Sequence, residues 1–293
     1  MPLLVAALLL LQAVISVHTE LVTVPVVVTD AHGQHVAGLG PEHFRVYEDG
    51  WLQPIAAFHQ GNSPVTLGLV VDRSQSMRPK QSALLVAIAA LVLPGYQEDE
   101  LFGVGFNDRV AFALPASRPF AGDAREIAAA LSAIPAEGRT GLYDGVAEAL
   151  QHLQLGRAPG KALIIVSDGG DNASGRTYAE VLALARRSDA VIYAIGLMGT
   201  PPVEEEEDGR LLERLSKDTG GRAYFPRTTA EIAAVSAHVA RSLREQYVLG
   251  FVPGGPAAGR AFRRIEVRVS AEGYGRIHVR ARSGYVADGV TEP

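Results

Sequence analysis

From residue 64 onward, short apolar runs alternate with segments in which apolar residues recur at the period of a helix. Residues 162–166 read ALIIV, an unbroken apolar run that is typical of a strand buried on both faces of a parallel sheet. In the segment near 79–93, Leu84, Ile88 and Leu91 are spaced so that all three fall on one face of a helix. This alternation predicts an α/β domain with a doubly wound, largely parallel sheet.

The same pattern places the individual elements along this part of the chain. The predicted strands cover 65–71, 101–106, 110–114, 162–167, 191–196 and 223–225. The predicted helices lie near 79–93, 123–133, 142–155, 177–188, 208–219 and 229–246. Only Asn107, Asp108 and Arg109 join the second strand to the third, so we expect a hairpin with one antiparallel strand there.

Residues 19–62 have the pattern of β-structure. Valines occupy every second position from Val22 to Val28, which is the period of a strand with one buried face. Pro25 has no N–H to donate to a neighbouring strand, so we expect this strand to lie at a sheet edge or to carry a bulge. Further along, Asp49 and Gly50 separate two short strand-like runs and predict a tight hairpin.

Residues 247–293 return to the strand pattern, with Ile265, Val267 and Val269 alternating with charged residues. Neither terminal segment is long enough to bury a core by itself. The simplest arrangement pairs the two segments into one small β-sandwich. This sandwich would flank the α/β domain, which we assign to residues 63–246.

Residues 3–17 form a mostly apolar run that precedes all of these elements. A membrane-spanning helix needs roughly 20 apolar residues, so we interpret residues 1–18 as a secretory signal peptide, although no Lys or Arg precedes the run. An uncleaved anchor is the alternative, and it would be the chain's contact with a membrane. Together with the absence of cysteine, which fits an oxidising compartment, this predicts an exported protein that is periplasmic, secreted or at the cell surface.

Charge and composition exclude several classes of function. The chain carries 32 acidic and 27 basic side chains, a net charge of −5, and no stripe of basic residues that would bind nucleic acid. With no cysteine, it can form no disulfide scaffold, thiolate zinc site, iron–sulfur cluster or cysteine nucleophile. Residues 156–162 resemble a phosphate-binding loop only loosely, because the glycine spacing is one residue short and Ala162 replaces the required Ser or Thr.

Polar side chains cluster where the apolar strands end. Asp72, Ser74 and Ser76 follow the first predicted strand at alternate positions, Asp168 follows the fourth, and Thr140 lies in a loop that opens a helix. If the first and fourth strands are neighbours, their carboxyl ends meet at one crevice of the sheet. All five side chains offer oxygen atoms only, which suit Mg²⁺, Mn²⁺ or Ca²⁺. An N-cap cluster before the next helix could explain the Asp-x-Ser-x-Ser run alone, but not the other two positions.

This set of residues resembles the metal-ion-dependent adhesion site of von Willebrand factor type A domains. Asp72-x-Ser74-x-Ser76, Thr140 and Asp168 match its three-part motif, and residues 65–243 match the family in element order. The whole chain resembles a bacterial subfamily. Its sequence marks are VVVTD at 26–30, FRVYEDG at 44–50, LYD at 142–144, YVLGF at 247–251 and SGY at 283–285.

The resemblance implies a Rossmann-like fold and a binding function. In the family, the serine hydroxyls bind a divalent cation directly, the threonine binds it directly or through water, and the aspartates act mainly through water. An Asp or Glu carboxylate of a protein partner then completes the shell. The chain departs from the family at Arg73 and Gln75, where a small residue and glycine are more usual. We expect both side chains to point away from the metal.

The predicted function is therefore divalent-metal-dependent protein binding or adhesion, without catalysis. One alternative is an assembly or regulatory subunit of a bacterial envelope complex that uses the same site. A metal-dependent hydrolase is a further alternative, and it would need a general base near the metal. Asp144 and Asp171 lie close to the motif in sequence and could extend the site. The simpler interpretation is that they cap a helix and a loop.

Overall fold

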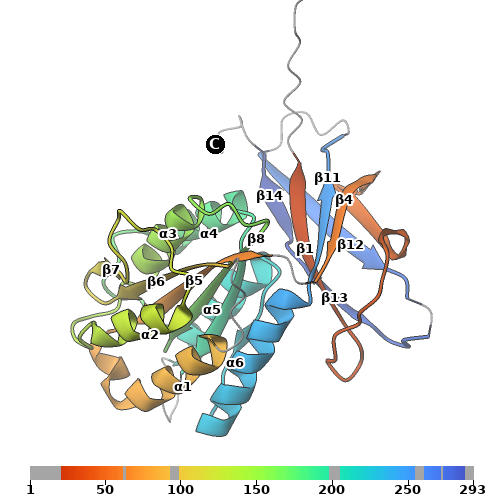
Figure 1. The fold of residues 1–293 in the computed structure, drawn as a ribbon. Helices are drawn as coiled ribbons and strands as arrows, with labels where there is room; N and C mark the ends of the chain where they lie inside the picture. Colours follow the sequence, from red (N-terminus) through yellow and green to blue (C-terminus); the bar gives the residue numbers. More distant parts are fainter. Residues whose placement is uncertain are drawn as a thin grey trace, which may run out of the picture.

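A six-stranded sheet forms the centre of the computed structural model, which describes residues 21–61, 64–92, 99–197, 205–254, 261–271 and 273–287 (Figure 1). The strand order is β10-β9-β8-β5-β6-β7, and all neighbours are parallel except the β6–β7 hairpin. The strands are β5 (Val65–Asp72), β6 (Glu100–Phe106), β7 (Val110–Phe112), β8 (Gly160–Ser167), β9 (Val191–Gly196) and β10 (Ala223–Tyr224). The predicted parallel sheet with one antiparallel hairpin is thus confirmed.

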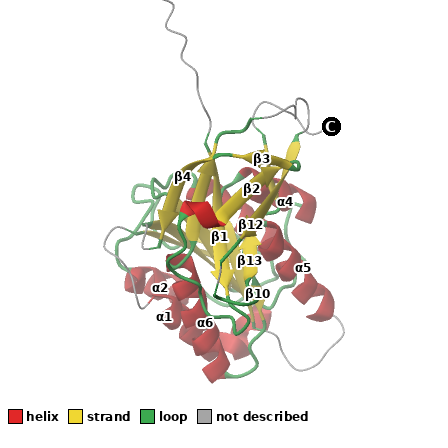
Figure 2. Cartoon of the chain, turned by 90° about the vertical axis from the view of Figure 1, so that its right-hand side faces the viewer, coloured by secondary structure: helices red, strands yellow, loops and turns green. Residues whose placement is uncertain are grey.

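Helices cover both faces of this sheet, as Figures 1 and 2 show. On one face lie α1 (Gln81–Val92), α2 (Ala124–Ala133) and α6 (Thr229–Arg244). On the other lie α3 (Leu142–Leu153), α4 (Tyr178–Arg187) and α5 (Glu205–Asp218). The predicted helical face of Leu84, Ile88 and Leu91 packs into the first of these layers. Successive residues of β5 and β8 point alternately into the two layers, which is why apolar residues follow one another in the middle of both strands.

The two terminal segments form a β-sandwich beside the α/β domain (Figure 1). Its sheets have the orders β13-β1-β11-β4 and β14-β12-β2-β3, and each sheet takes two strands from either end of the chain. The strands are β1 (Val22–Thr29), β2 (Phe44–Glu48), β3 (Trp51–Gln53), β4 (Ile55–Gln60), β11 (Tyr247–Phe251), β12 (Phe262–Val269), β13 (His278–Ala281) and β14 (Gly284–Val286). Between the sheets lies a core that includes Val24, Phe44, Tyr247 and Phe251. The predicted sandwich is confirmed, whereas the predicted signal peptide lies outside the described residues.

Two local predictions in the sandwich had different outcomes. The hairpin at Asp49 and Gly50 is confirmed, since both residues have positive φ, 47° and 86°, and they join β2 directly to β3. The placement of β1 at an edge was wrong, because β1 lies between β13 and β11 and has no bulge in either pairing. Proline is tolerated because the pairing with β13 starts only at Val26, so Pro25 has no partner strand on that side.

Polar contacts fix the sandwich to the α/β domain at the start of the parallel strands. The buried Arg282 of the sandwich donates to the carbonyl of Arg186 at the end of α4, at 2.7 Å. The N–H of Ser283 donates to the carbonyl of Asp218 at the end of α5, at 3.2 Å. Strands rise by about 3.3 Å per residue, so the carboxyl end of β5 lies roughly 23 Å further on. That edge of the sheet faces away from the sandwich.

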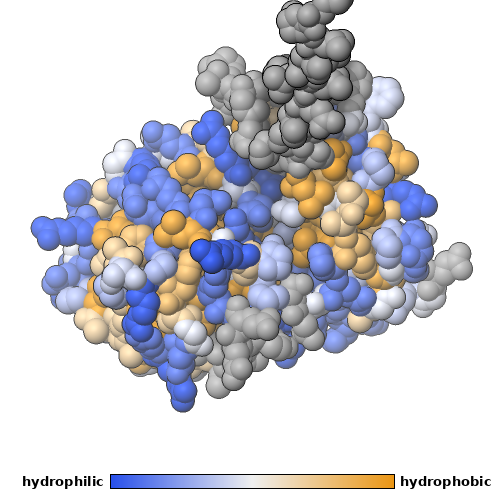
Figure 3. Space-filling view, turned by 45° about the horizontal axis from the view of Figure 1, so that its top comes forward, coloured by the Kyte–Doolittle hydropathy of each residue, from blue (hydrophilic) through white to orange (hydrophobic). Residues whose placement is uncertain are grey.

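The surface is mixed in character. On the face shown in Figure 3, polar and apolar patches are interspersed over the α/β domain, and a broader apolar area lies over the sandwich. Large exposed apolar side chains of the sandwich include Leu21, Trp51, Leu52 and Val252. Within the described part of the chain, no helix has the length and apolar character needed to cross a membrane.

Deletion of residues 247–293 should destroy the sandwich, because it removes two strands from each sheet. The apolar face of β1, including Val24 and Val26, would then be exposed, and we expect aggregation in size-exclusion chromatography and loss of a cooperative thermal transition. Deletion of residues 288–293 is the control, since it starts after β14. A monomeric 1–246 fragment with cooperative unfolding would contradict the interdependence of the two terminal segments.

Candidate metal centre

Asp72, the last residue of β5, is fully buried. The pairing of Val71 with Val166 brings it beside Ser167 at the end of β8. One carboxylate oxygen accepts a hydrogen bond from the backbone N–H of Ser74 at 2.8 Å. The other accepts one from the hydroxyl of Ser167 at 2.7 Å. The carboxylate is therefore held in one orientation at the carboxyl edge of the sheet.

Ser74 and Ser76 bring two hydroxyl groups together immediately after the strand. Ser74 directly precedes a 3₁₀ helix, Gln75–Lys80, and Ser76 lies inside it. Their hydroxyl oxygens are 2.9 Å apart. Ser74 is buried and Ser76 is exposed, so this pair of oxygens extends from the Asp72 carboxylate toward solvent.

Thr140 lies in the loop that precedes α3, and backbone hydrogen bonds hold this loop on both sides. Its N–H donates to the side-chain oxygen of Asn172 at 2.8 Å, and its carbonyl accepts from the N–H of Asn172 at 2.9 Å. Toward the serines, the N–H of Gln75 donates to the carbonyl of Gly138 at 3.0 Å. Gly138 has φ of 74°, and a Cβ atom there would clash with the side chain of Asp108. The Thr140 loop is thus joined to the segments that carry Ser76 and Asp168.

Asp168 follows β8 directly and forms an ion pair with Lys80 at the end of the 3₁₀ helix. The ammonium nitrogen lies 3.0 Å from one carboxylate oxygen of Asp168. The exposed fractions of the two side chains are 20% for Lys80 and 14% for Asp168. This contact links the first and third parts of the predicted motif across the crevice.

The electrostatics at Asp72 favour the approach of a cation. Burial raises the pKa of Asp72 to about 6, although hydrogen bonds from Ser74 and Ser167 oppose this rise; the negative charge of Asp168 adds to it. Among the described residues, no basic side chain lies within ion-pairing distance of Asp72. A cation bound close to this carboxylate would stabilise its negative charge.

The donor atoms at this edge fit a hard divalent cation. The described residues contain no group of three His, Cys, Asp or Glu side chains that could hold a metal. The predicted ligand set consists of the carboxylates of Asp72 and Asp168 and the hydroxyls of Ser74, Ser76 and Thr140. An all-oxygen set suits Mg²⁺, Mn²⁺ or Ca²⁺, whereas zinc and copper sites use imidazole or thiolate ligands.

Arg73, where the sequence departs from the family, points away from this crevice. Its guanidinium donates to the carbonyls of Ile134 and Ser132 at the end of α2, and to the side-chain oxygen of Gln81 at 2.6 Å. Burial lowers the pKa of Arg73, while the negative charge of Asp72 opposes the shift. The expected orientation of Arg73 is confirmed. Gln75 is exposed at the start of the 3₁₀ helix.

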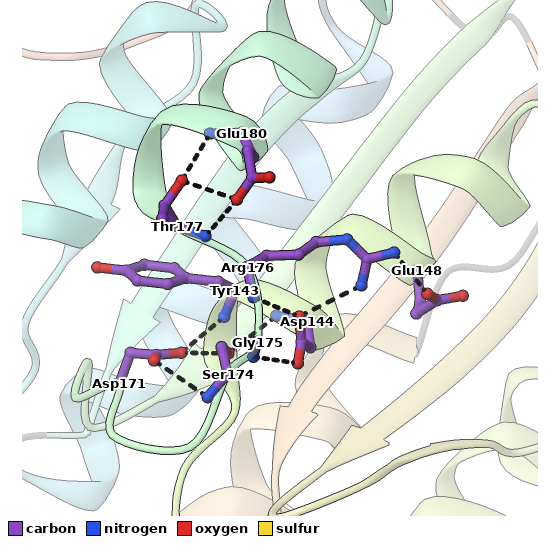
Figure 4. A network of polar contacts seen from close by, with 9 residues as sticks. All are labelled: Tyr143, Asp144, Glu148, Asp171, Ser174, Gly175, Arg176, Thr177 and Glu180. Carbon is purple, nitrogen blue, oxygen red and sulfur yellow. Dashed lines mark hydrogen bonds and ion pairs between the residues drawn. The ribbon is translucent and has the colours of Figure 1, made fainter.

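Asp144 and Asp171 belong to a separate network that fixes the start of α3 to the loop after β8 (Figure 4). Asp171 accepts from the N–H of Tyr143 at 2.9 Å and from the hydroxyl of Ser174 at 2.6 Å. Asp144 accepts from the N–H of Gly175 and from the guanidinium of Arg176, and these bonds outweigh burial and lower its pKa. Both residues accept backbone N–H bonds as expected of caps, but their roles are exchanged: Asp171 holds the start of α3 and Asp144 holds the loop after β8.

Three residues at the site had no place in the predicted ligand set. Ser167 directly precedes Asp168 at the end of an apolar strand, so its position in the sequence could have indicated that it lies at the site. Asn172 holds Thr140 through its side-chain amide, and Lys80 reaches Asp168 from the far end of the 3₁₀ helix. Neither of these two contacts follows from sequence spacing, because each depends on how two loops pack.

Replacement of Asp72 by Asn should stabilise the metal-free protein at neutral pH. Burial raises the folded-state pKa of this carboxyl to about 6, above its ordinary value of 3.8. Between these two values the unfolded chain has lost the proton while the folded protein keeps it, so the unfolding free energy falls over this range, by on the order of 3 kcal/mol in all once the pH exceeds 6. Denaturant unfolding in EDTA should show D72N more stable near pH 7.5, with no difference near pH 3, where the carboxyl is protonated in both states.

The control for this measurement is Asp108→Asn, which removes an exposed carboxylate on the neighbouring loop. We expect no stabilisation from it at either pH. If the wild type and D72N were equally stable across the whole range, the Asp72 carboxylate would not be desolvated as described.

Known proteins share this architecture. The family model for the von Willebrand factor type A domain matches residues 67–238. A solved von Willebrand factor type A protein from Catenulispora acidiphila has a TM-score of 0.51 at 13% identity, covering 84% of this chain and 74% of its own. For proximal thread matrix protein 1 from the mussel byssus the TM-score is 0.51 at 18% identity, with 67% and 51% covered.

The vWF domain of the type V pili tip protein Mfa5 from Porphyromonas gingivalis gives a TM-score of 0.48 at 14% identity, over 62% of this chain and 95% of its own. No curated protein sequence is significantly similar to this chain. The family model nevertheless matches more than half of the residues, and the sheet order and helix layers agree with it. This chain is a member of the von Willebrand factor type A domain family.

Proposed function

We propose that this protein binds one divalent cation at Asp72, Ser74, Ser76, Thr140 and Asp168, and that the loaded site captures an Asp or Glu side chain of a protein partner. The observation that carries the proposal is the buried Asp72 carboxylate, with no basic side chain of the described residues paired to it, below two hydroxyls 2.9 Å apart. A buried charge of this kind is costly without a counter-ion. A cation at the crevice supplies one.

The charge of each donor group determines its role at the site. The hydroxyls of Ser74, Ser76 and Thr140 are neutral, so they hold a cation without cancelling its charge. Asp72 is tied to Ser74 and Ser167 and orients the serine loop around the site. When bound, the cation supplies a strong positive field at the rim of the crevice, to which an anionic oxygen of a partner is attracted.

The position of the site suits a partner of protein size. The crevice lies at the sheet edge that faces away from the sandwich, and Ser76 is exposed there. We propose an exported location, which rests on the apolar run at residues 3–17 and on the absence of cysteine. A subunit that assembles or regulates an envelope complex would use the same site and would differ in its partner.

A binding function is favoured over hydrolysis because the nearby acids are already engaged. Asp144 and Asp171 accept hydrogen bonds that hold the start of α3 and the loop after β8. A general base must be free to take a proton from a bound water or substrate. A measured turnover on ester or phosphoester substrates would favour the hydrolase instead.

Calorimetric titration with Mn²⁺ tests the ligand set. The wild type should bind one Mn²⁺, and Asp72→Ala should bind none. Ser76→Ala and Thr140→Val each remove one donor oxygen and should weaken binding by about tenfold or more. Ser132→Ala is the matched control, because this hydroxyl bonds to the Ala128 carbonyl on α2. Equal affinity in all five proteins would show that the cation binds elsewhere.

The partner's carboxylate should be coupled to the metal. A short peptide with a single Asp should tighten Mn²⁺ binding by about fivefold or more, and Mn²⁺ should tighten peptide binding by the same factor. The same peptide with Asn is the control and should have no effect. Capture of a stoichiometric partner from envelope extract in Mg²⁺ but not in EDTA would identify the natural ligand. Capture that is equal in both buffers would contradict a metal-dependent interaction.

A further inference from the structure

We infer that Lys80 is a built-in competitor for the cation: its ammonium group neutralises Asp168 in the metal-free protein and lowers the affinity of the site for divalent metal. The inference concerns the regulation of the proposed site and rests on that proposed function. It assigns a role to a residue outside the five predicted ligands. The contact that carries it is the 3.0 Å ion pair between Lys80 and Asp168.

The position of Lys80 is set by the same short helix that carries the serines. The 3₁₀ helix runs over Gln75–Lys80, so Ser76 lies near its start and Lys80 at its end. Pro79 precedes Lys80 within the helix and fixes its own φ angle. The ion pair is mostly shielded from solvent, with exposed fractions of 20% and 14%. Water therefore screens it less than it screens a surface pair.

Other basic side chains around the crevice are engaged elsewhere. Arg73 donates to carbonyls at the end of α2, and Arg78 donates to the carbonyl of Ala136 at 2.7 Å. Arg139 pairs with Asp108 at 3.1 Å, and Arg176 pairs with Asp144 and Glu148. Among these side chains, Lys80 is the one that contacts a predicted metal ligand.

The consequence follows from the sign of the charges. A divalent cation that binds the Asp168 carboxylate, directly or through water, competes with the ammonium group that is already paired with it. It must replace that group or bind beside a like charge, and both lower its affinity. In the metal-free protein the ammonium has the opposite effect. It offsets one of two neighbouring carboxylates and so stabilises the unloaded crevice.

Substitutions at Lys80 test this with Mn²⁺ calorimetry. Lys80→Met removes the charge at similar side-chain length and should lower the dissociation constant for Mn²⁺ by about tenfold, the scale expected for a partly buried pair. Lys80→Arg keeps the charge and should stay within about threefold of the wild type. Arg78→Met removes one charge from the same helix without touching Asp168, and it should leave the constant unchanged.

A second readout needs no metal. In EDTA, Lys80→Met should unfold at a temperature about 2–4 °C below the wild type. Without the ammonium group, the negative charge of Asp168 has no positive partner and repels that of Asp72. Saturating Mn²⁺ should abolish or reverse this difference. Unchanged or weaker Mn²⁺ binding in Lys80→Met would overturn the inference, as would equal tightening in Arg78→Met, which would reflect net charge alone.

The outcomes separate this inference from the proposed function. If the wild type binds no Mn²⁺ but Lys80→Met does, Lys80 blocks the site and the proposed metal-dependent function of the natural protein fails. If both bind with equal affinity, the metal site stands and the role of Lys80 fails. If neither binds and their stabilities in EDTA agree, both are wrong.

Discussion

The pairing of β5 with β8 determines where the polar groups of this protein meet. Val71 lies opposite Val166, and the next residues along the two strands, Asp72 and Ser167, are therefore neighbours joined by a 2.7 Å hydrogen bond. Successive residues of both strands face opposite helical layers, so a shift by one position would move each side chain into the other layer and disrupt its packing. The core thus fixes the register, and the register places a buried carboxylate at the sheet edge. The loops that carry Ser74 and Thr140 are then bonded to that edge.

The order of elements and the layout of the motif could be predicted from the sequence because they depend on local patterns. The run at 162–166 and the spacing of Leu84, Ile88 and Leu91 indicated strand and helix directly, and the turn at Asp49 and Gly50 fixed a hairpin. The order of strands in the sandwich was harder to predict from the sequence. Pro25 indicated an edge strand, but a neighbouring strand that pairs with only half of β1 gives proline the same freedom inside the sheet.

In the candidate site too, one part could be predicted from the sequence and another could not. Oxygen-bearing residues at two strand ends were evident from spacing, since strands in a parallel sheet end at one edge. Contacts made between loops were not. Asn172 holds Thr140, and Lys80 reaches Asp168 across the crevice, through distances that only the folded loops define. Asp144 and Asp171 have the right chemistry for a metal, yet they are engaged by the N–H groups of Gly175 and Tyr143.

The two ends of the α/β domain therefore have different roles. One end is fixed to the sandwich through Arg282 and Ser283, and the other carries the polar side chains of the candidate metal site. The most direct measurement of the central claim is an anomalous difference map from crystals grown with Mn²⁺. The account predicts one strong peak bounded by the oxygens of Ser74, Ser76 and Thr140. A map without a peak there, or with its strongest peak at Asp144 and Asp171, would contradict it.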